Sequence, residues 1–169
     1  MIERALVTGG AGFIGSHIVE QLGAFGCSVT VLDNLSSGYR RNLDVYPQVR
    51  MIEGDVRDGA TVRRAMAGAD VVFHLAASVG NARSIENPIH DSEVNVLGTL
   101  NILEAARHER VGKLVFSSSA GIYGELKTLP ISEDHPVDPD SPYGASKLAA
   151  EKLCLAYAKI YPLECVCLR

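Results

Sequence analysis

Short apolar runs alternate with stretches of helical periodicity along the whole chain. The apolar runs predict six strands, at Arg4 to Thr8, Ser28 to Asp33, Val49 to Glu53, Val71 to Leu75, Lys113 to Ser117 and Leu163 to Leu168. Helices are predicted to begin near Gly12, Asp58, Pro88 and Ser141, and near-helical apolar spacing predicts a long amphipathic helix from Ser92 to His108. This alternation predicts an α/β domain with a parallel sheet and helices on both faces.

Two long segments between these elements lack a regular pattern. Asn34 to Gln48 is rich in Ser, Arg and Asn, and Gly124 to Asp140 is rich in Pro and Asp. Long irregular connections in compact domains often lie over binding sites, although either segment would also serve as a solvated connection.

Length and composition indicate one globular domain over residues 1–169, because 47% of the residues are hydrophobic and the length suits a single core. The formal net charge of −4 gives no broad positive field, which argues against nucleic acid or a membrane surface as the main partner. The first apolar run is too short for a signal peptide or a membrane span, so we expect a cytoplasmic protein.

The cysteines Cys27, Cys154, Cys165 and Cys167 show no CxxC or Cys/His spacing of a metal site. They lie in apolar stretches, so we expect buried free thiols and no metal. Cys165 and Cys167 alternate along a strand and share a face, which disfavours a disulfide between them.

A glycine-rich turn joins the first predicted strand to the first helix. Gly9, Gly12 and Gly15 are spaced three apart, and Asp33 ends the second strand 18 residues after Gly15. Glycines allow a tight turn and close approach of a pyrophosphate to the helix N-terminus, and the carboxylate accepts hydrogen bonds from ribose hydroxyls. The pattern predicts a Rossmann-type doubly wound sheet that binds NAD. Asp33 favours NAD over NADP, although Arg40 and Arg41 weaken that preference.

A second acidic position follows the third predicted strand. Asp55 is placed to accept a hydrogen bond from the adenine amino group while Val56 packs on the ring. Aspartate is also common as a cap at the end of such a strand, so this alternative stays open.

Candidate proton-transfer residues lie on the helix predicted to begin near Ser141 and at the carboxyl end of the fifth predicted strand. Tyr143 and Lys147 are at i and i+4 on one helix face, where an ammonium favours the phenolate form of a neighbouring tyrosine. Such pairs are common on solvated helix surfaces. The segment Ser117 to Gly124 nevertheless adds three consecutive hydroxyls where open α/β sheets bind ligands. Serine, tyrosine and lysine together supply the proton half of a hydride transfer beside a nicotinamide.

These segments, in this order, resemble the extended short-chain dehydrogenase/reductases, and most closely their NAD-dependent sugar-nucleotide 4-epimerases of the UDP-glucose/UDP-galactose type. The resemblance covers the whole chain. It rests on Thr8 to Gly15 (TGGAGFIG), Asp33 to Gly38 (DNLSSG), Gly54 to Asp58 (GDVRD), His74 to Ala77 (HLAA), Asn95, Ser117 to Gly124 (SSSAGIYG) and Ser141 to Lys147 (SPYGASK).

The resemblance implies that Ser119, Tyr143 and Lys147 are catalytic, that Lys147 also holds the nicotinamide ribose, and that Asn95 braces the active-site helix. In the family's epimerases, hydride leaves the sugar C4 for NAD and is returned to the other face. The implied cofactor residues are Gly9, Gly12, Phe13, Ile14, Gly15, Asp33, Asn34, Ser37, Gly38, Asp55, Val56, Leu75, Ala76, Ala77, Asn95, Ser117, Tyr143 and Lys147.

The resemblance also implies a nucleotide-sugar substrate, a UDP-hexose, bound mostly by a substrate domain that is largely absent from this chain. Arg83, Ser84 and Ser119 are the candidate substrate residues, and solvated loop positions are the alternative for the first two. Related dehydratases carry an acidic pair where this chain has Ala120 and Gly121, which favours epimerisation, although Glu125 is near.

Two further functional hypotheses remain open. One is a dinucleotide-binding module without turnover, and the other is a reductase that uses the same serine, tyrosine and lysine. A homodimer is expected through the helices from Glu93 to His108 and from Tyr143 to Lys159, although each apolar face would also serve to cover its own sheet.

Overall fold

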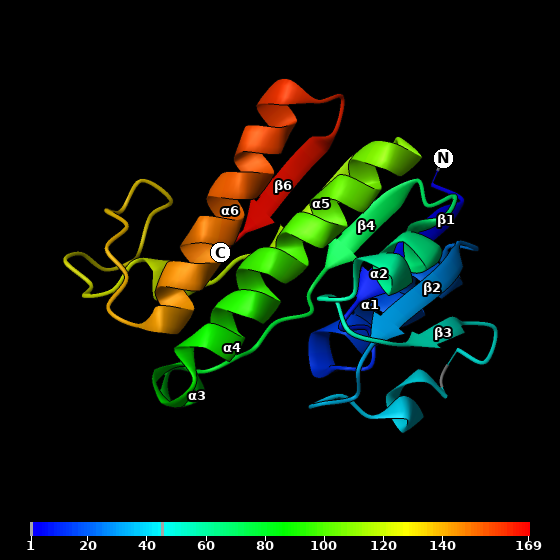
Figure 1. The fold of residues 1–169 in the computed structure, drawn as a ribbon, viewed down its shortest axis with the longest axis horizontal. Coiled ribbons are helices and arrows are strands. Elements are labelled where there is room, and N and C mark those ends of the chain that lie inside the picture. Colours follow the sequence, from blue (N-terminus) through cyan, green and yellow to red (C-terminus); the bar gives the residue numbers. More distant parts are fainter. Residues whose placement is uncertain (1, 45) are drawn as a thin grey trace.

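The computed structural model describes residues 2–44 and 46–169 and contains one six-stranded parallel sheet (Figure 1). The strand order is β3-β2-β1-β4-β5-β6, so the order reverses between β1 and β4. This order defines the Rossmann fold and confirms the predicted fold class. All six predicted strands are present, three of them one residue shorter than predicted. They are β1 (Arg4–Thr8), β2 (Ser28–Asp33), β3 (Arg50–Glu53), β4 (Val71–His74), β5 (Lys113–Ser117) and β6 (Glu164–Leu168).

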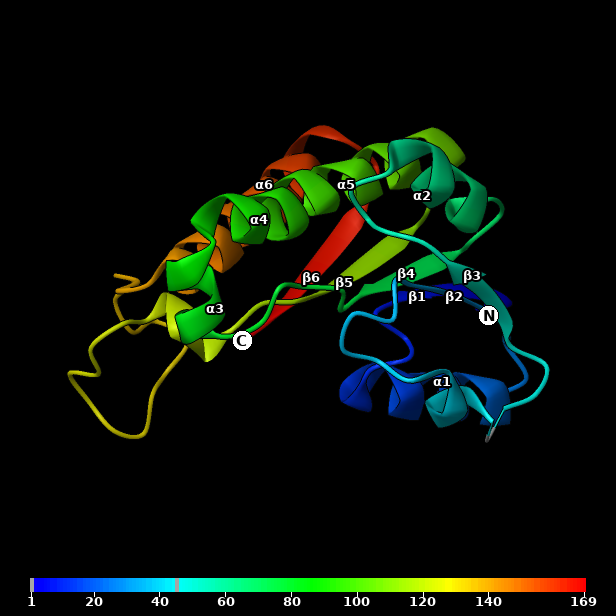
Figure 2. The same cartoon turned by 60° about the horizontal axis from the view of Figure 1, so that its bottom comes forward.

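Helices cover both faces of the sheet, as Figure 2 shows, with α1 below it and α2, α5 and α6 above it. The α-helices are α1 (Phe13–Ala24), α2 (Gly59–Met66), α3 (Asn81–Glu86), α4 (Pro88–Ser92), α5 (Gly98–Glu109) and α6 (Pro142–Ile160). Short 3₁₀ or π turns are η1 (Arg40–Leu43), η2 (Glu93–Leu97) and η3 (Ala120–Ile122).

Side-chain caps fix where two of the predicted helices begin. The Asp58 carboxylate accepts a hydrogen bond from the backbone N–H of Ala60 at the start of α2. The Ser141 hydroxyl accepts one from Gly144 at the start of α6, where Pro142 occupies the first turn. Both residues satisfy backbone donors that a helix start leaves free.

The connection between β4 and β5 contains more separate helical segments than the sequence predicts. The helix predicted from Ser92 to His108 continues α4 and passes through the π turn η2 before it becomes α5. Asn87 starts this helix by accepting a hydrogen bond from the N–H of His90. The short helix α3 was not predicted, because six residues after Gly80 are too few to show a helical period.

Each face of the sheet has its own apolar core. Leu6 and Leu32 belong to the cluster under α2, α5 and α6, whereas Val7 and Val31 belong to the cluster under α1. All four side chains are fully buried, as expected for the central strands of a sheet covered on both faces. The rigid sheet therefore fixes the position of every loop that leaves its carboxyl edge.

The four cysteines are free thiols, as expected, but they are not equally buried. Cys27 and Cys154 are buried, whereas Cys165 and Cys167 are only half-buried because β6 is an edge strand. Both half-buried thiols pack against the same core cluster, which confirms their shared face.

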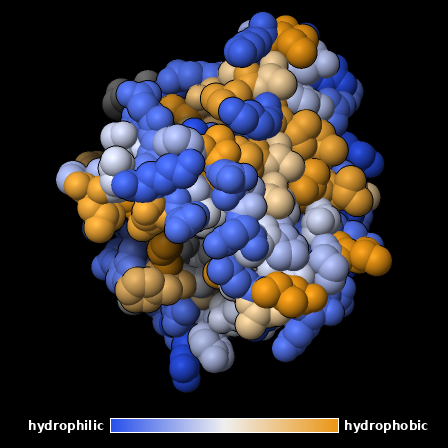
Figure 3. Space-filling model, turned by 90° about the vertical axis from the view of Figure 1, so that its left-hand side faces the viewer, coloured by the Kyte–Doolittle hydropathy of each residue, from blue (hydrophilic) through white to orange (hydrophobic). Residues whose placement is uncertain are grey.

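The surface mixes apolar and hydrophilic side chains. Figure 3 shows orange patches separated by blue ones on the side of the molecule that carries α3 and the segment 124–140. Across the described ranges 2–44 and 46–169, no helix combines the length and apolar character needed to cross a membrane.

Candidate active site

A pocket of about 660 Å³ opens at the carboxyl edge of the sheet, where the strand order reverses. Open α/β sheets bind their ligands at this position. All of the predicted cofactor residues except Asn95 line the pocket. The lining residues are Gly9, Gly12, Phe13, Ile14, Gly15, Asp33, Asn34, Ser37, Gly38, Asp55, Val56, Leu75, Ala76, Ala77, Ser117, Tyr143 and Lys147.

The glycine turn has no room for side chains at two of its positions. Gly9 has a φ of +70°, and a Cβ there would lie 2.8 Å from the backbone nitrogen of Ala76. A Cβ at Gly15 would overlap the carbonyl oxygen of Gly9. The turn therefore brings bare backbone to the start of α1, which is the arrangement that a pyrophosphate requires.

The Asp33 carboxylate ties the glycine turn to the loop after β2. Its Oδ2 accepts a hydrogen bond from the N–H of Ala11 at 3.0 Å, and its Oδ1 accepts one from Leu35 at 2.8 Å. Each carboxylate oxygen has two acceptor positions, so one on each oxygen remains for ribose hydroxyls.

The two arginines that weakened the preference for NAD are engaged elsewhere. Arg40 forms an ion pair with Glu53 at 2.9 Å. The guanidinium of Arg41 lies 4.8 Å from the centre of the Tyr39 ring. Neither side chain lines the pocket at Asp33.

Asp55 lines the pocket but is more heavily engaged than the sequence suggests. Its two oxygens accept hydrogen bonds from the backbone N–H and the guanidinium of Arg57 and from the Asn34 amide. The hydrogen bonds from Arg57 hold the pKa of this carboxyl well below its usual value. All four acceptor positions are occupied. A bond from Asp55 to an adenine amino group therefore requires one of these partners to move.

Lys147 is the buried cation of the pocket. Its side chain is 3% exposed, and its Nζ lies 4.2 Å from the centre of the Phe116 ring on β5. Burial lowers the pKa of this amine to about 8, while Cys154, Asp91, Cys167 and Glu151, in that order, act in the opposite direction. Tyr143, one turn earlier on α6, lines the same pocket.

Ser119 and Tyr143 both lie close to Gly121. The Ser119 hydroxyl oxygen accepts a hydrogen bond from the N–H of Gly121 at 3.0 Å. A Cβ at Gly121 would lie 3.3 Å from that oxygen and 3.7 Å from the Tyr143 ring. Ser119 itself does not line the pocket, whereas Ser117 and Ser118 do. The structure thus brings the predicted catalytic residues together with Ser119 at the margin.

Asn95 lies behind the pocket and joins three segments near it: the loop after β4, α4 and α6. Its amide nitrogen lies 3.1 Å from the Ser78 carbonyl oxygen, 3.1 Å from Asp91 Oδ1 and 3.0 Å from Ser146 Oγ. Its side-chain oxygen accepts a hydrogen bond from the Ser78 N–H. This geometry suits a brace between the π turn and α6 and does not suit contact with a cofactor.

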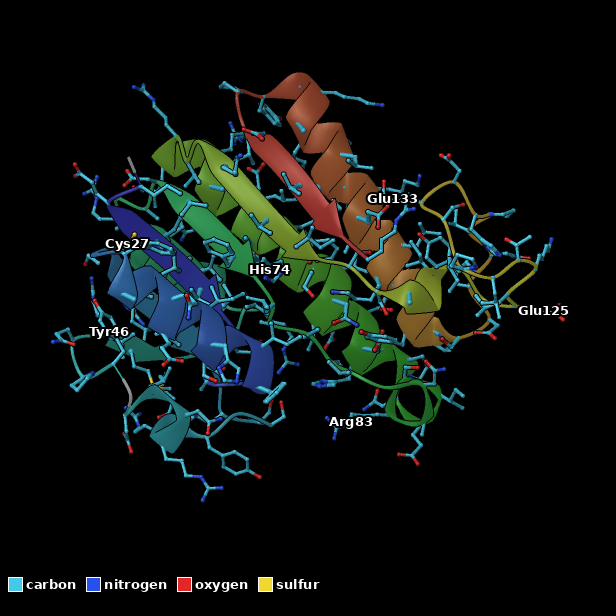
Figure 4. All side chains as sticks on the ribbon, turned by 180° about the vertical axis from the view of Figure 1, so that it is seen from behind. Cys27, Tyr46, His74, Arg83, Glu125 and Glu133 are labelled. Carbon is cyan, nitrogen blue, oxygen red and sulfur yellow. The ribbon has the colours of Figure 1, made fainter. Side chains whose placement is uncertain are left out.

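The two substrate candidates on α3 differ. Arg83 lines the pocket from an exposed position near its rim (Figure 4). Ser84 is fully buried, and its hydroxyl donates to the Asn81 carbonyl at 2.8 Å. Ser84 therefore does not line the pocket, because α3 turns its hydroxyl inward. Figure 4 shows Glu125 on the outer part of the segment 124–140, and it does not line the pocket.

Sequence reasoning missed several side chains that complete the wall. Arg57, His90 and Val94 also line the pocket. Arg57 was visible in the segment Gly54 to Asp58, but its pairing with Asp55 was not. His90 and Val94 reach the pocket because the helix containing η2 passes across it, which no local pattern indicates.

His74 lies behind the pocket at the end of β4 (Figure 4), and its ring is neutral. Burial lowers the pKa of this imidazole to about 3, and Lys147 acts in the same direction. Nδ1 lies 2.7 Å from Thr8 Oγ1, and Nε2 lies 3.0 Å from Thr99 Oγ1. Because the Thr99 hydroxyl donates to the Asn95 carbonyl, Nε2 of His74 donates and Nδ1 accepts.

Acid is therefore expected to destabilise the domain through His74. In the unfolded chain this histidine takes up a proton near the ordinary histidine pKa of 6.5, and in the folded chain only near 3. Stability falls as the pH is lowered through that window because the unfolded state binds more protons, by about 2 kcal/mol from pH 7.5 to pH 5. Urea unfolding across this range should show that loss. His74→Gln should flatten it, whereas the surface control His17→Gln should keep it; an equal slope in both variants would refute the assignment.

A family model described as "NAD dependent epimerase/dehydratase family" matches residues 5–169. A putative UDP-glucose 4-epimerase from Methanocaldococcus jannaschii is 44% identical over 166 residues, which are 97% of this chain and 54% of that protein. The chain spans about half the length of the curated relatives it matches.

Solved structures of an epimerase and a dehydratase are also similar to this chain. A UDP-glucose 4-epimerase from Thermus thermophilus in complex with NAD has a TM-score of 0.92 and 49% identity, over 98% of this chain and 54% of that one. A dTDP-glucose 4,6-dehydratase from Streptomyces venezuelae with NAD bound has a TM-score of 0.90 and 39% identity, over 97% of this chain and 54% of that one.

Proposed function

The chain belongs to the NAD-dependent epimerase/dehydratase family, and on this premise we propose that it provides the NAD site and the proton-transfer residues of a UDP-hexose 4-epimerase. One observation carries the proposal. Tyr143 and Lys147 line the same pocket as the glycine turn and Asp33. The similar proteins named as UDP-glucose 4-epimerases support the choice of reaction.

The residues present fit NAD. The turn at Gly9 and Gly15 offers bare backbone and the N-terminus of α1 to the pyrophosphate, and Asp33 keeps free acceptor positions for a ribose. A carboxylate there also repels a 2′-phosphate, so we propose NAD and not NADP. When bound, NAD supplies a nicotinamide that reversibly accepts a hydride.

The protein's own part in the reaction is to hold the sugar and move a proton. The Tyr143 phenolic oxygen takes the proton of the sugar 4-hydroxyl and returns it in the reverse step. The Lys147 ammonium favours the phenolate and, when NAD is bound, would hold the nicotinamide ribose by hydrogen bonds. Ser119 is proposed to bond the reacting oxygen, which requires its hydroxyl to turn from Gly121 towards the pocket. Arg83, at the rim, is the proposed contact for the nucleotide sugar.

Epimerisation is preferred to dehydration because of the residues after β5. Dehydration needs a second acid or base near the sugar, and Ala120 and Gly121 provide none. Glu125 lies on the outer part of its loop and does not line the pocket. A binding module without turnover remains the second candidate, because Ser119 does not line the pocket.

The first experiment combines cofactor release with a turnover assay. The purified chain is denatured, the supernatant is assayed for NAD and NADH, and a native sample is tested for interconversion of UDP-glucose and UDP-galactose without added cofactor. Released NAD with turnover would support the epimerase. Released NAD without turnover would favour the binding module, and no NAD under saturating conditions would refute the proposed site.

We also propose a cytoplasmic homodimer. Leu97 on η2 is 54% exposed and Leu155 on α6 is 36% exposed, so apolar side chains remain on the outer side of these helices. Free thiols throughout the described ranges suit a reducing compartment. Sedimentation velocity would test the dimer, and a monomer at micromolar concentration would refute it.

A further inference from the structure

Asp91 is a buried carboxylate that the proposed reaction does not use. It lies on α4, is 1% exposed and does not line the pocket. Its Oδ1 accepts a hydrogen bond from the Asn95 amide at 3.1 Å, and its Oδ2 accepts one from the Ser146 hydroxyl. Among residues 2–44 and 46–169, no basic side chain forms an ion pair with it. A buried carboxylate without a compensating charge is costly, so its presence needs a reason.

Among the described acidic groups around Lys147, Asp91 is the carboxylate that has no paired cation. Glu151, the other buried carboxylate near Lys147, is paired with Arg169 at 2.7 Å. His74 is neutral, and the hydrogen bond to Cys167 together with burial raises the pKa of the Cys154 thiol. The remaining titratable groups that face Lys147 are Tyr143 on its own helix and Cys167 on β6. The hydrogen bond from Cys154 lowers the pKa of Cys167, so this thiol is the competing source of negative charge.

We propose that Asp91 is the buried counter-charge of Lys147 and positions it through Ser146, the residue that directly precedes Lys147 on α6. Two contacts carry the proposal. The carboxylate accepts a hydrogen bond from Ser146, so its negative charge is fixed to the position of α6 that directly precedes Lys147. Asn95 fastens the same carboxylate to η2 and to the Ser78 backbone, so the charge cannot move without disturbing the pocket wall.

The Asp91 charge therefore keeps the Lys147 amine protonated, although burial excludes water from it. Burial pushes the pKa of Lys147 down to about 8, and Asp91 is among the groups that oppose this. Without that carboxylate, the ammonium would lose its proton closer to neutral pH. The charged form is the one that favours the Tyr143 phenolate, so Asp91 acts on the site without touching a ligand.

The test follows the titration of Lys147 in the chain itself, without cofactor or sugar. Lysine side chains are labelled with ¹³C at Cε, the Lys147 signal is identified by its loss in Lys147→Met, and its midpoint is read by NMR. Asp91→Asn keeps the shape of the side chain and removes its charge. We expect this variant to lower the Lys147 midpoint by about one pH unit.

Glu93→Gln is the matched control, because it removes a carboxylate two positions away that is 44% exposed and pairs with Arg57. The Lys147 midpoint should stay within about 0.3 pH units of the wild type in this variant, since exposed charges are screened. Asp91→Glu, which retains the charge, should also keep the midpoint near the wild-type value. Cys167→Ser tests the competing thiolate, and a larger shift there than in Asp91→Asn would overturn the proposal.

Circular dichroism shows first whether each variant is folded. If Asp91→Asn does not fold, Asp91→Ser provides a smaller neutral side chain for the same measurement. A folded neutral variant with an unchanged Lys147 midpoint would show that Asp91 only braces Ser146, and the proposal would fail. Because the experiment uses neither NAD nor sugar, its outcome is independent of whether the chain is an epimerase.

Discussion

Tyr143→Phe is expected to lower the rate of UDP-glucose and UDP-galactose interconversion by about 10²- to 10⁴-fold, the usual contribution of a positioned acid or base. The substitution removes one oxygen atom from a half-buried side chain that lines the pocket. The ring remains to pack beside Gly121, so the fold and the glycine turn should be unaffected. The content of NAD released on denaturation should therefore equal that of the wild type.

The matched control is Tyr161→Phe, which removes the same oxygen beyond the far end of α6, where the ring lies beside Arg107 and Tyr157. This variant should interconvert the two sugars at the wild-type rate. Equal rates for Tyr143→Phe and the wild type would contradict the assigned proton transfer. A loss of both turnover and NAD in Tyr143→Phe would indicate a cofactor-holding role instead.

The sequence predicts the sheet and the glycine turn well because both depend on local signals. Short apolar runs form the strands of a sheet that helices cover on both faces. A strand followed by Gly9, Gly12 and Gly15 at this spacing is typical of a dinucleotide-binding turn. The same holds for the start of α6, where Ser141 and Pro142 form a local cap. Tyr143 and Lys147 then follow one turn apart, so their place at the pocket comes from the helix itself.

The sequence does not predict features that arise from contacts between distant segments. Asp55 is recognisable as a polar residue after a strand, but its occupied oxygens depend on Arg57 and on Asn34 from another loop. The inward direction of Ser84 depends on how Gly80 turns the chain into α3. The role of His74 depends on Thr8 and Thr99, which lie on two other elements. These contacts require the tertiary structure.

Arg169→Met is expected to lower the free energy of unfolding by about 3–5 kcal/mol at neutral pH, because it leaves a buried carboxylate without its cation. Glu151 on α6 is 1% exposed, and Arg169 donates to its Oε1 at 2.7 Å and to its Oε2 at 3.3 Å. The only other partner of this carboxylate in the described ranges is the Ser118 hydroxyl, at 2.6 Å. Urea unfolding at pH 7.5 measures the loss.

Arg107→Met is the matched control, since Arg107 forms a comparable pair with Glu104 at 2.8 Å on the surface. Glu104 is 44% exposed, so this variant should lose no more than about 1 kcal/mol. Equal losses in the two variants would show that burial does not set the strength of the Glu151 pair.

The pH dependence gives this prediction a second, independent test. Burial acts to raise the pKa of Glu151, but the hydrogen bonds from Arg169 and Ser118 outweigh it and hold that pKa below its usual value. The pair therefore contributes stability above the unfolded pKa of the carboxyl and loses it as the pH falls. In Arg169→Met the carboxyl takes up a proton more readily, so the deficit should shrink from pH 7.5 to pH 5. A deficit in unfolding free energy that stays constant from pH 7.5 to pH 5 would instead point to lost packing of the arginine stem over Tyr123, whose ring lies 5.4 Å from the guanidinium.

The same substitution should also weaken NAD retention, because the Glu151 carboxylate bonds Ser118, which lines the pocket beside Ser117.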